Sequence, residues 1–213
     1  MSRNSVALAV VTLLFLLVPM WQGSAIASEN SAQAVESMKK GLTFGELGRH
    51  QEALTAFKEA VRLQPDNPLA HCLLGTAYSH LGRFQEAIEA YKQAIHIKPD
   101  FATAYFDLGA AYHKIGRRQE AVDAYKEAIR LKPDFGDAYN NLGAAYHTLG
   151  QHKKAVEALK EAIRLNPGDA YAHYTLGSAY LSLGNRVAAL EEYKILQSLD
   201  REKAEELSNL INK

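Results

Sequence analysis

The stretch that decides the fold runs from residue 102 to residue 135 and reads ATAYFDLGAAYHKIGRRQEAVDAYKEAIRLKPDF. In its first half, Tyr105 and Tyr112 are two helical turns apart and belong to one apolar helical face. Gly116 follows this face, and glycine is the residue type that ends a helix in a left-handed conformation without steric cost. The second half is again amphipathic, and Pro133 ends it because proline lacks an amide hydrogen. The stretch therefore predicts two helices joined by a tight turn.

The same features recur along the chain at one constant interval, the spacing from Gly75 to Gly109. Five residue series keep this spacing: Gly41, Gly75, Gly109, Gly143 and Gly177; Gly48, Gly82, Gly116, Gly150 and Gly184; Ala53, Ala87, Ala121, Ala155 and Ala189; Phe44, Tyr78, Tyr112, Tyr146 and Tyr180; and Pro65, Pro99, Pro133 and Pro167. Ten of the 14 glycines belong to the first two series, so they indicate helix contacts and turns. A period of this length is typical of stacked helical repeats and predicts an all-α protein.

The first glycine series needs its own explanation, because glycine within a helix costs about 1 kcal/mol relative to alanine. Gly109 lies in the first half of its unit and Ala121 in the second, and small residues at both places predict that the paired helices approach each other closely. We expect an aromatic side chain of the Tyr112 series to fill the space beside them.

These residues resemble the tetratricopeptide repeat, a helix–turn–helix unit of about 34 residues. The matching residues of the third unit are Tyr105, Leu108, Gly109, Tyr112, Gly116, Ala121, Tyr125, Ala128 and Pro133. The resemblance implies an all-α, right-handed α-solenoid of five tandem units, at residues 34–67, 68–101, 102–135, 136–169 and 170–203. The outer units depart from the pattern, as is usual for the ends of an array that face water.

A C-terminal capping helix is expected over residues 200–213. Asp200 is placed to cap its N-terminus. Ala204, Leu207 and Ile211 form an apolar stripe that predicts packing against the fifth unit.

Residues 1–27 have the pattern of a secretory signal peptide. Arg3 precedes an uncharged run, Val6–Val18, and Ala25-Ile26-Ala27 forms a small-x-small cleavage site. An uncleaved membrane anchor is the alternative, although the apolar run is short for a span of about 18 or more residues. A short N-terminal segment, residues 28–33, would then begin the mature chain. We expect export, with the Gram-negative periplasm as the compartment.

The composition excludes several classes of function. The 213 residues include 24 Lys+Arg and 24 Asp+Glu, a balance that predicts no nucleic-acid partner and no membrane partner beyond the export signal. The one cysteine, Cys72, excludes an intramolecular disulfide. No motif of a phosphate loop or of a nucleophile elbow is present. We therefore predict no enzymatic activity, no catalytic residue, no metal and no cofactor.

The resemblance implies that the first helix of each unit lines a concave groove that binds partners. The candidate groove residues are Cys72, Thr76, His80, Phe106, Asp107, His113, Asn140, Asn141, His147, Tyr174 and Ser178. A peptide clamp of the carboxylate type is not expected, because no cations converge around Asn141 in neighbouring units.

Three of these candidates leave alternatives open. Asn141 resembles one rung of the asparagine ladder of O-GlcNAc transferases, or it is a solvated amide on a helix surface. His113 and His147 lie one repeat apart, close enough to share a metal, although polar groove residues are the simpler interpretation because further ligands are lacking. Cys72 is either a small apolar residue or a reactive thiol.

The predicted function is a protein–protein interaction scaffold that binds a segment of a protein or peptide partner in its groove, in cell-envelope assembly or secretion. The alternatives are a self-assembling structural building block, which would be a homo-oligomer, and a regulatory subunit that docks an enzyme.

Overall fold

The computed structural model describes residues 28–212, and the expected signal peptide at 1–27 lies outside the described residues. One helix covers residues 28–46, so the segment 28–33 continues directly into the first repeat. The helices that follow are α2 (His50–Leu63), α3 (Pro68–His80), α4 (Phe84–Ile97), α5 (Ala102–Lys114), α6 (Arg118–Leu131), α7 (Gly136–Thr148), α8 (His152–Leu165), α9 (Ala170–Ser182), α10 (Arg186–Leu199) and α11 (Arg201–Ile211).

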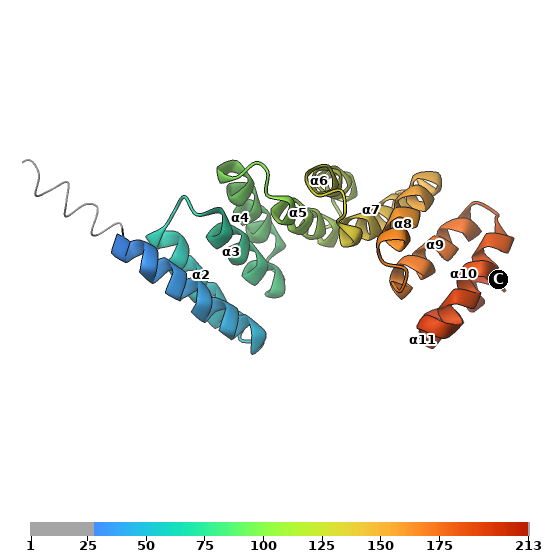
Figure 1. Ribbon diagram of the computed structural model, residues 1–213, viewed down its shortest axis with the longest axis horizontal. Coiled ribbons are helices and arrows are strands. Elements are labelled where there is room, and N and C mark those ends of the chain that lie inside the picture. The colour runs from blue at the N-terminus through green and yellow to red at the C-terminus, as the bar shows by residue number, and fades with distance from the viewer. Residues whose placement is uncertain (1–27, 213) are drawn as a thin grey trace, which may run out of the picture.

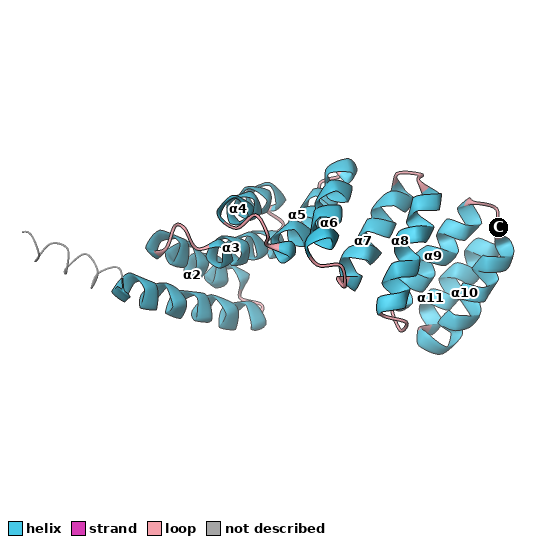
Figure 2. Ribbon diagram, turned by 45° about the horizontal axis from the view of Figure 1, so that its top comes forward, coloured by secondary structure: helices cyan, strands magenta, loops and turns pink. Residues whose placement is uncertain are grey.

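These helices form successive pairs that stack side by side along one axis (Figures 1 and 2). Each pair contacts the next, as α4 contacts α5 and α6 contacts α7. In Figure 1 the array bends into an arch that has α4 and α6 on its outer side. The predicted all-α solenoid is thereby confirmed. Among residues 28–212, no helix combines the length and the apolar character that crossing a membrane requires.

The turn within each pair is built on a left-handed glycine. Gly116 has φ of +78°, and the amide of Arg117 donates to the carbonyl of Tyr112 at 2.9 Å. This is the hydrogen bond of a Schellman motif, which satisfies a carbonyl at the helix end. The corresponding glycines of the other units have φ between +70° and +74°. The turn predicted from the second glycine series is confirmed.

The glycine within each first helix makes room for a side chain of a facing helix. A Cβ atom added to Gly109 would lie 2.7 Å from Cε1 of Tyr125. Gly75 has the same relation to Tyr91, at 2.6 Å. The expected close approach therefore exists, but the ring against the glycine is Tyr125 and not a member of the Tyr112 series. The reason is that Tyr125 extends from the facing helix toward α5, whereas Tyr112 lies on α5 itself.

The C-terminal helix covers the end of the array as predicted. Ala204, Leu207 and Ile211 are buried against α9 and α10, and Oδ1 of Asp200 accepts from the amide of Lys203 at 3.1 Å. Leu207 also takes the place that Tyr125 has in the third unit, because a Cβ on Gly177 would lie 2.5 Å from its Cδ2. The capping helix is therefore part of the core of the last unit.

Candidate binding site on the inner face

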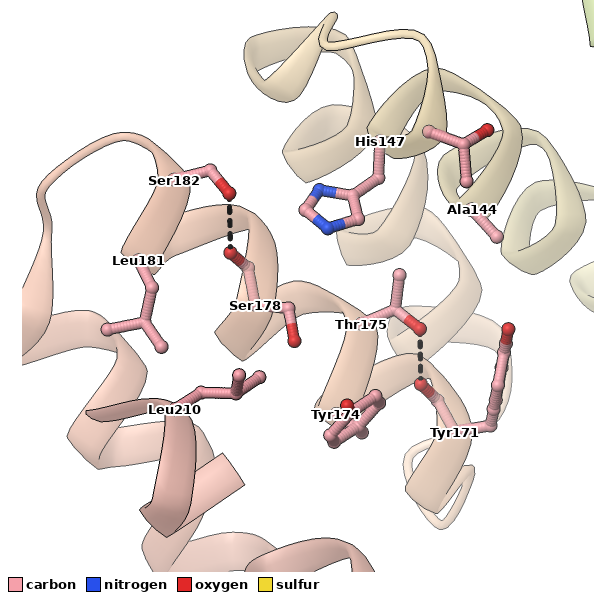
Figure 3. Close-up of a pocket in the computed structure, with 10 residues that line it drawn as sticks. Ala144, His147, Tyr171, Tyr174, Thr175, Ser178, Leu181, Ser182 and Leu210 are labelled. Carbon is pink, nitrogen blue, oxygen red and sulfur yellow. Dashed lines mark hydrogen bonds between the residues drawn. The ribbon is translucent and has the colours of Figure 1, made fainter. Parts of the chain in front are cut away.

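The first helices of the units form the inner face of the array, and a hollow of about 580 Å³ lies on this face near the C-terminal end. Figure 3 shows that its walls come from three helices. His147 projects from α7, Tyr171 and Tyr174 from α9, and Leu210 from α11. The hollow therefore exists only where the capping helix packs beside two successive repeats.

The lining of the hollow is uncharged apart from any proton on His147. Among the described residues, no Asp, Glu, Lys or Arg contributes to it. The Tyr171 side of the hollow is open, since this residue is 48% exposed. An uncharged lining with aromatic walls favours an uncharged ligand, because a charge placed there would lose hydration without gaining an opposite charge.

Four serine and threonine hydroxyl groups line the hollow. Those of Thr148, Thr175 and Ser182 donate to carbonyl oxygens of their own helices, at 2.9, 2.9 and 3.1 Å. Each of these oxygens keeps lone pairs that can accept a further hydrogen bond. The Ser178 hydroxyl is different, because its oxygen is buried and has no hydrogen-bond partner within the described residues. The hollow thus offers three hydroxyl acceptors to a ligand, which suit neutral amide N–H groups, and the Ser178 hydroxyl lies behind this lining.

His147 connects the hollow to a second histidine. Its Nδ1 lies 3.1 Å from Nδ1 of His152, and the two ring centroids are 5.0 Å apart. Burial, and after it the charge of His152, lower the pKa of His147. The imidazole of His147 is therefore held neutral near pH 7, and one of the two rings donates an N–H to the other.

The middle of the inner face holds a carboxyl group next to a thiol. Sγ of Cys72 donates to Oδ2 of Asp107 at 3.7 Å. Burial raises the pKa of Asp107 to about 6, against the opposing effect of this hydrogen bond. Burial and then the charge of Asp107 raise the pKa of the Cys72 thiol to about 12. The thiol is 5% exposed and protonated, so the structure places it in the core as a small apolar group.

A smaller hollow, of about 200 Å³, lies between the first and second units. Thr76 and His80 contribute to it. The His80 ring stacks on the ring of His50, with centroids 4.6 Å apart and planes at 4°. This hollow lies near the opposite end of the array from the first one.

The remaining predicted residues pack within the solenoid. The Phe106 ring lies 4.8 Å from the Phe135 ring, and Asn140 is 7% exposed. Asn141 is partly buried on α7. His113 is half-buried, and burial together with Arg118 and Lys114 lowers its pKa. His113 and His147 are not brought into a metal site: among residues 28–212, no group of three or more His, Cys, Asp or Glu side chains is placed to hold a metal ion.

The structure thus gathers three of the predicted residues in the larger hollow, namely His147, Tyr174 and Ser178. The hollow also contains residues that were not predicted: Ala144, Thr148, Tyr171, Thr175, Leu181, Ser182 and Leu210. The repeat register is a signal for all of these residues except Leu210, since each of them occupies an inward-facing place of its unit. Leu210 belongs to the capping helix, which lies outside the repeat period, so no register pointed to it.

Stacked helix pairs with a hollowed inner face define a helical-repeat scaffold for protein–protein interaction. Family models described as "TPR repeat" match residues 41–82, 77–116 and 115–150, and one described as "Tetratricopeptide repeat" matches residues 136–169. The chain belongs to the tetratricopeptide repeat family.

Solved structures agree with this assignment. The structure of the MamA protein is 32% identical, with a TM-score of 0.72, over 81% of this chain and 94% of that one. MamA from Desulfovibrio magneticus RS-1 is 25% identical, with a TM-score of 0.73, over 80% of this chain and 96% of that one. YrrB, a TPR protein with an unusual peptide-binding site, is 21% identical, with a TM-score of 0.71, over 88% and 97% of the chains, and shares the fold. No curated protein matches the chain significantly.

Proposed function

We propose that this protein is a non-enzymatic scaffold that binds an uncharged stretch of a protein partner in the hollow between α7, α9 and α11. The observation that carries the proposal is the lining, in which neutral hydroxyl groups and aromatic rings surround a space of about 580 Å³. A peptide backbone offers neutral donors and acceptors, and a bulky apolar side chain would fill the space between Tyr174 and Leu210.

We further propose that the protein works outside the cytoplasm, in cell-envelope assembly or secretion. The basis is the sequence of residues 1–27, where Arg3, the run Val6–Val18 and Ala25-Ile26-Ala27 follow the order of an export signal. Mass spectrometry of the protein from a periplasmic extract tests this proposal. We expect an N-terminus at Ser28, and an intact chain in the membrane fraction would contradict it.

Photocrosslinking in the native compartment tests the binding site. Benzoylphenylalanine in place of Tyr171 puts the reactive group at the open side of the hollow, and the same residue in place of Lys160 puts it on the exposed surface of α8. We expect the first position to capture a partner and the second to capture none. Ser182→Leu, at an exposed position of the lining, fills the hollow without adding charge and should reduce capture from position 171 while the melting temperature stays close to that of the parent. Capture from position 160 alone would refute the proposed site.

A second candidate function is self-assembly, and the surface of α10 favours it. Val187 is 71% exposed and Ile195 is 40% exposed, and Leu199 continues the same ridge one helical turn later. Other units have polar residues at the first two registers: Gln85, Gln119 and Lys153 correspond to Val187, and Gln93, Glu127 and Glu161 correspond to Ile195. An apolar ridge at a position that is otherwise polar indicates contact with another surface. Light scattering tests this candidate. A dimeric parent that becomes monomeric in Val187→Gln would support self-assembly, and a monomeric parent would exclude it.

A further inference from the structure

His147 lines the proposed binding site and is in contact with His152. Protonation of these two imidazoles can therefore change the site. The two Nδ1 atoms are 3.1 Å apart, which is the distance of a hydrogen bond between ring nitrogens. Such a bond needs one hydrogen between the two atoms. It survives the first added proton, since an imidazolium donates to a neutral imidazole. It does not survive the second, since two N–H groups would then face each other at contact distance with like charge.

His147 is also a wall of the hollow, as Figure 3 shows. Its ring therefore cannot leave the contact with His152 without changing the lining. A doubly protonated pair would bring a positive charge into a space that otherwise has none. Such a charge is unfavourable beside an uncharged ligand, because the ligand offers it no counterion.

The charges around His147 do not relieve this repulsion. On α8, Lys153 and Lys154 directly follow His152, and the Lys154 Nζ lies 5.5 Å from the centroid of the Tyr146 ring. On α6, Lys126 lies 5.9 Å from the same centroid, and α5 contributes His113. Within the described part of α9 and α11, the residues that line the hollow include no acid. These neighbouring groups of the described chain are neutral or basic, so none of them offers a carboxylate to a second imidazolium.

The pair occurs in one unit of the array. One repeat earlier, the registers of His147 and His152 are occupied by His113 and Arg118, and one repeat later by Leu181 and Arg186. In the first unit His50 has the register of His152, but its ring stacks on His80 of the second unit, and the register of His147 is Gly45. The hydrogen-bonded pair therefore belongs to the fourth unit, one of the two units that line the hollow.

We infer that His147 and His152 form a proton-operated gate of the hollow, which binds its partner segment while the pair holds at most one added proton and releases it when a second proton separates the rings. The release step rests on the function proposed above, whereas the separation of the rings does not. Burial and the charge of His152 both lower the pKa of His147, so the second proton binds only on the acidic side of the ordinary histidine range.

Nuclear magnetic resonance of the protein alone tests the gate. We would follow the imidazole ¹⁵N signals and the backbone amides of Thr175 and Ser178 between about pH 8 and about pH 5, in the presence of a chelator. In the parent, the His147 signals should change in two steps, and the two amides should follow the more acidic step. In His152→Gln, His147 should titrate in a single step at higher pH. The inference would be overturned if His147 had the same titration midpoint in the parent and in His152→Gln. It would also be overturned if the amide signals of Thr175 and Ser178 did not shift in the second step.

Crosslinking from position 171 tests the release step at about pH 7.5 and about pH 5.5. Capture by the parent should fall several-fold at the lower pH, and capture by His147→Gln should be equal at the two values. His96→Gln, which changes an exposed histidine on α4, should behave as the parent does. An equal fall in His147→Gln would refute the gate. Absence of capture at both values would refute the proposed function, and the resonance titration would still decide whether the pair separates.

Discussion

The side-chain amide of Asn140 donates a 2.8 Å hydrogen bond to Oδ2 of Asp169, on the loop before α9. The other carboxylate oxygen, Oδ1, accepts from the amides of Tyr171 and Ala172 at 2.9 and 3.2 Å and so caps α9. Asn140 therefore holds the first turn of the helix that carries Tyr171 and Tyr174 to the hollow. Its amide nitrogen thus serves the position of the binding site, and the residue is 7% exposed.

We expect Asn140→Ala to lower the free energy of unfolding by about 1–2 kcal/mol, because Asp169 loses a buried donor. Urea denaturation measures this loss. Asn140→Asp should cost more, since it places a second carboxyl beside the first. Asn209→Ala, at an exposed position of α11, is the control and should change the free energy by less than about 0.5 kcal/mol. Equal effects of Asn140→Ala and Asn209→Ala would contradict the role of this hydrogen bond.

We expect Gly109→Ala to destabilise the protein by about 1–3 kcal/mol, although alanine is the better helix former. The new Cβ would lie 2.7 Å from Cε1 of Tyr125, whose ring is buried and has little room to move. Gly45→Ala provides a matched control, because Gly45 also lies in a helix and a Cβ there has no neighbour within 4 Å. This control should be stabilised by up to about 1 kcal/mol. Thermal melting of the two variants checks the opposite signs, and stabilisation of both would show that the ring contact is unimportant.

The buried carboxyl group of Asp107 should make the stability of the protein depend on pH. Its pKa is raised from 3.8 to about 6 in the folded protein, so the folded state holds this proton more tightly than the unfolded chain does. The contribution of this group to the free energy of unfolding therefore falls as the pH rises from about 4 to about 6, and is level above that range. We expect Asp107→Asn to stabilise the protein by about 1–2 kcal/mol at pH 7.5 and to have little effect at pH 4.

Urea denaturation of Asp107→Asn at these two pH values measures the difference. Asp123→Asn is the control, because Asp123 is exposed on α6 and its replacement should change the free energy of unfolding by less than about 0.5 kcal/mol at either pH. A stabilisation of Asp107→Asn that is the same at both values would mean that burial of the carboxylate is not its cause.

Cys72 should be unreactive in the folded protein. The thiol is 5% exposed, and burial with the nearby Asp107 raises its pKa to about 12, so the thiolate that reacts is scarce. We expect labelling by a maleimide to be slower than in urea by about two orders of magnitude or more. Asp107→Asn should accelerate the reaction, because it removes a negative charge beside the sulfur. Native labelling as fast as that of the unfolded chain would restore the interpretation of Cys72 as an accessible thiol.

The helices, their turns and the cap could be predicted from the sequence because each depends on chemistry that is local in the chain. Gly116 ends a helix whatever lies across from it, since only its own backbone has to reach positive φ. The constant repeat period follows for the same reason. The apolar stripe of α11 likewise predicted that this helix covers the array.

The composition of the hollow could not be predicted in this way. Asn140 and Ser178 both belong to inward-facing registers, yet one holds Asp169 and the other lines the hollow. Which of two such residues meets a neighbouring side chain depends on distances between helices, and these follow from the packing of many side chains together.

The first residue of the capping helix likewise does not follow from the repeat period. α9 begins at Ala170, and the position one repeat later is Ala204, but α11 begins earlier, at Arg201. This early start places Leu207 against Gly177 and Leu210 at the hollow. The repeat pattern alone sufficed for the solenoid, because its helices and turns depend on short-range backbone and side-chain chemistry. The binding hollow depends on how closely α7, α9 and α11 approach one another, and that separation is a property of the packed chain.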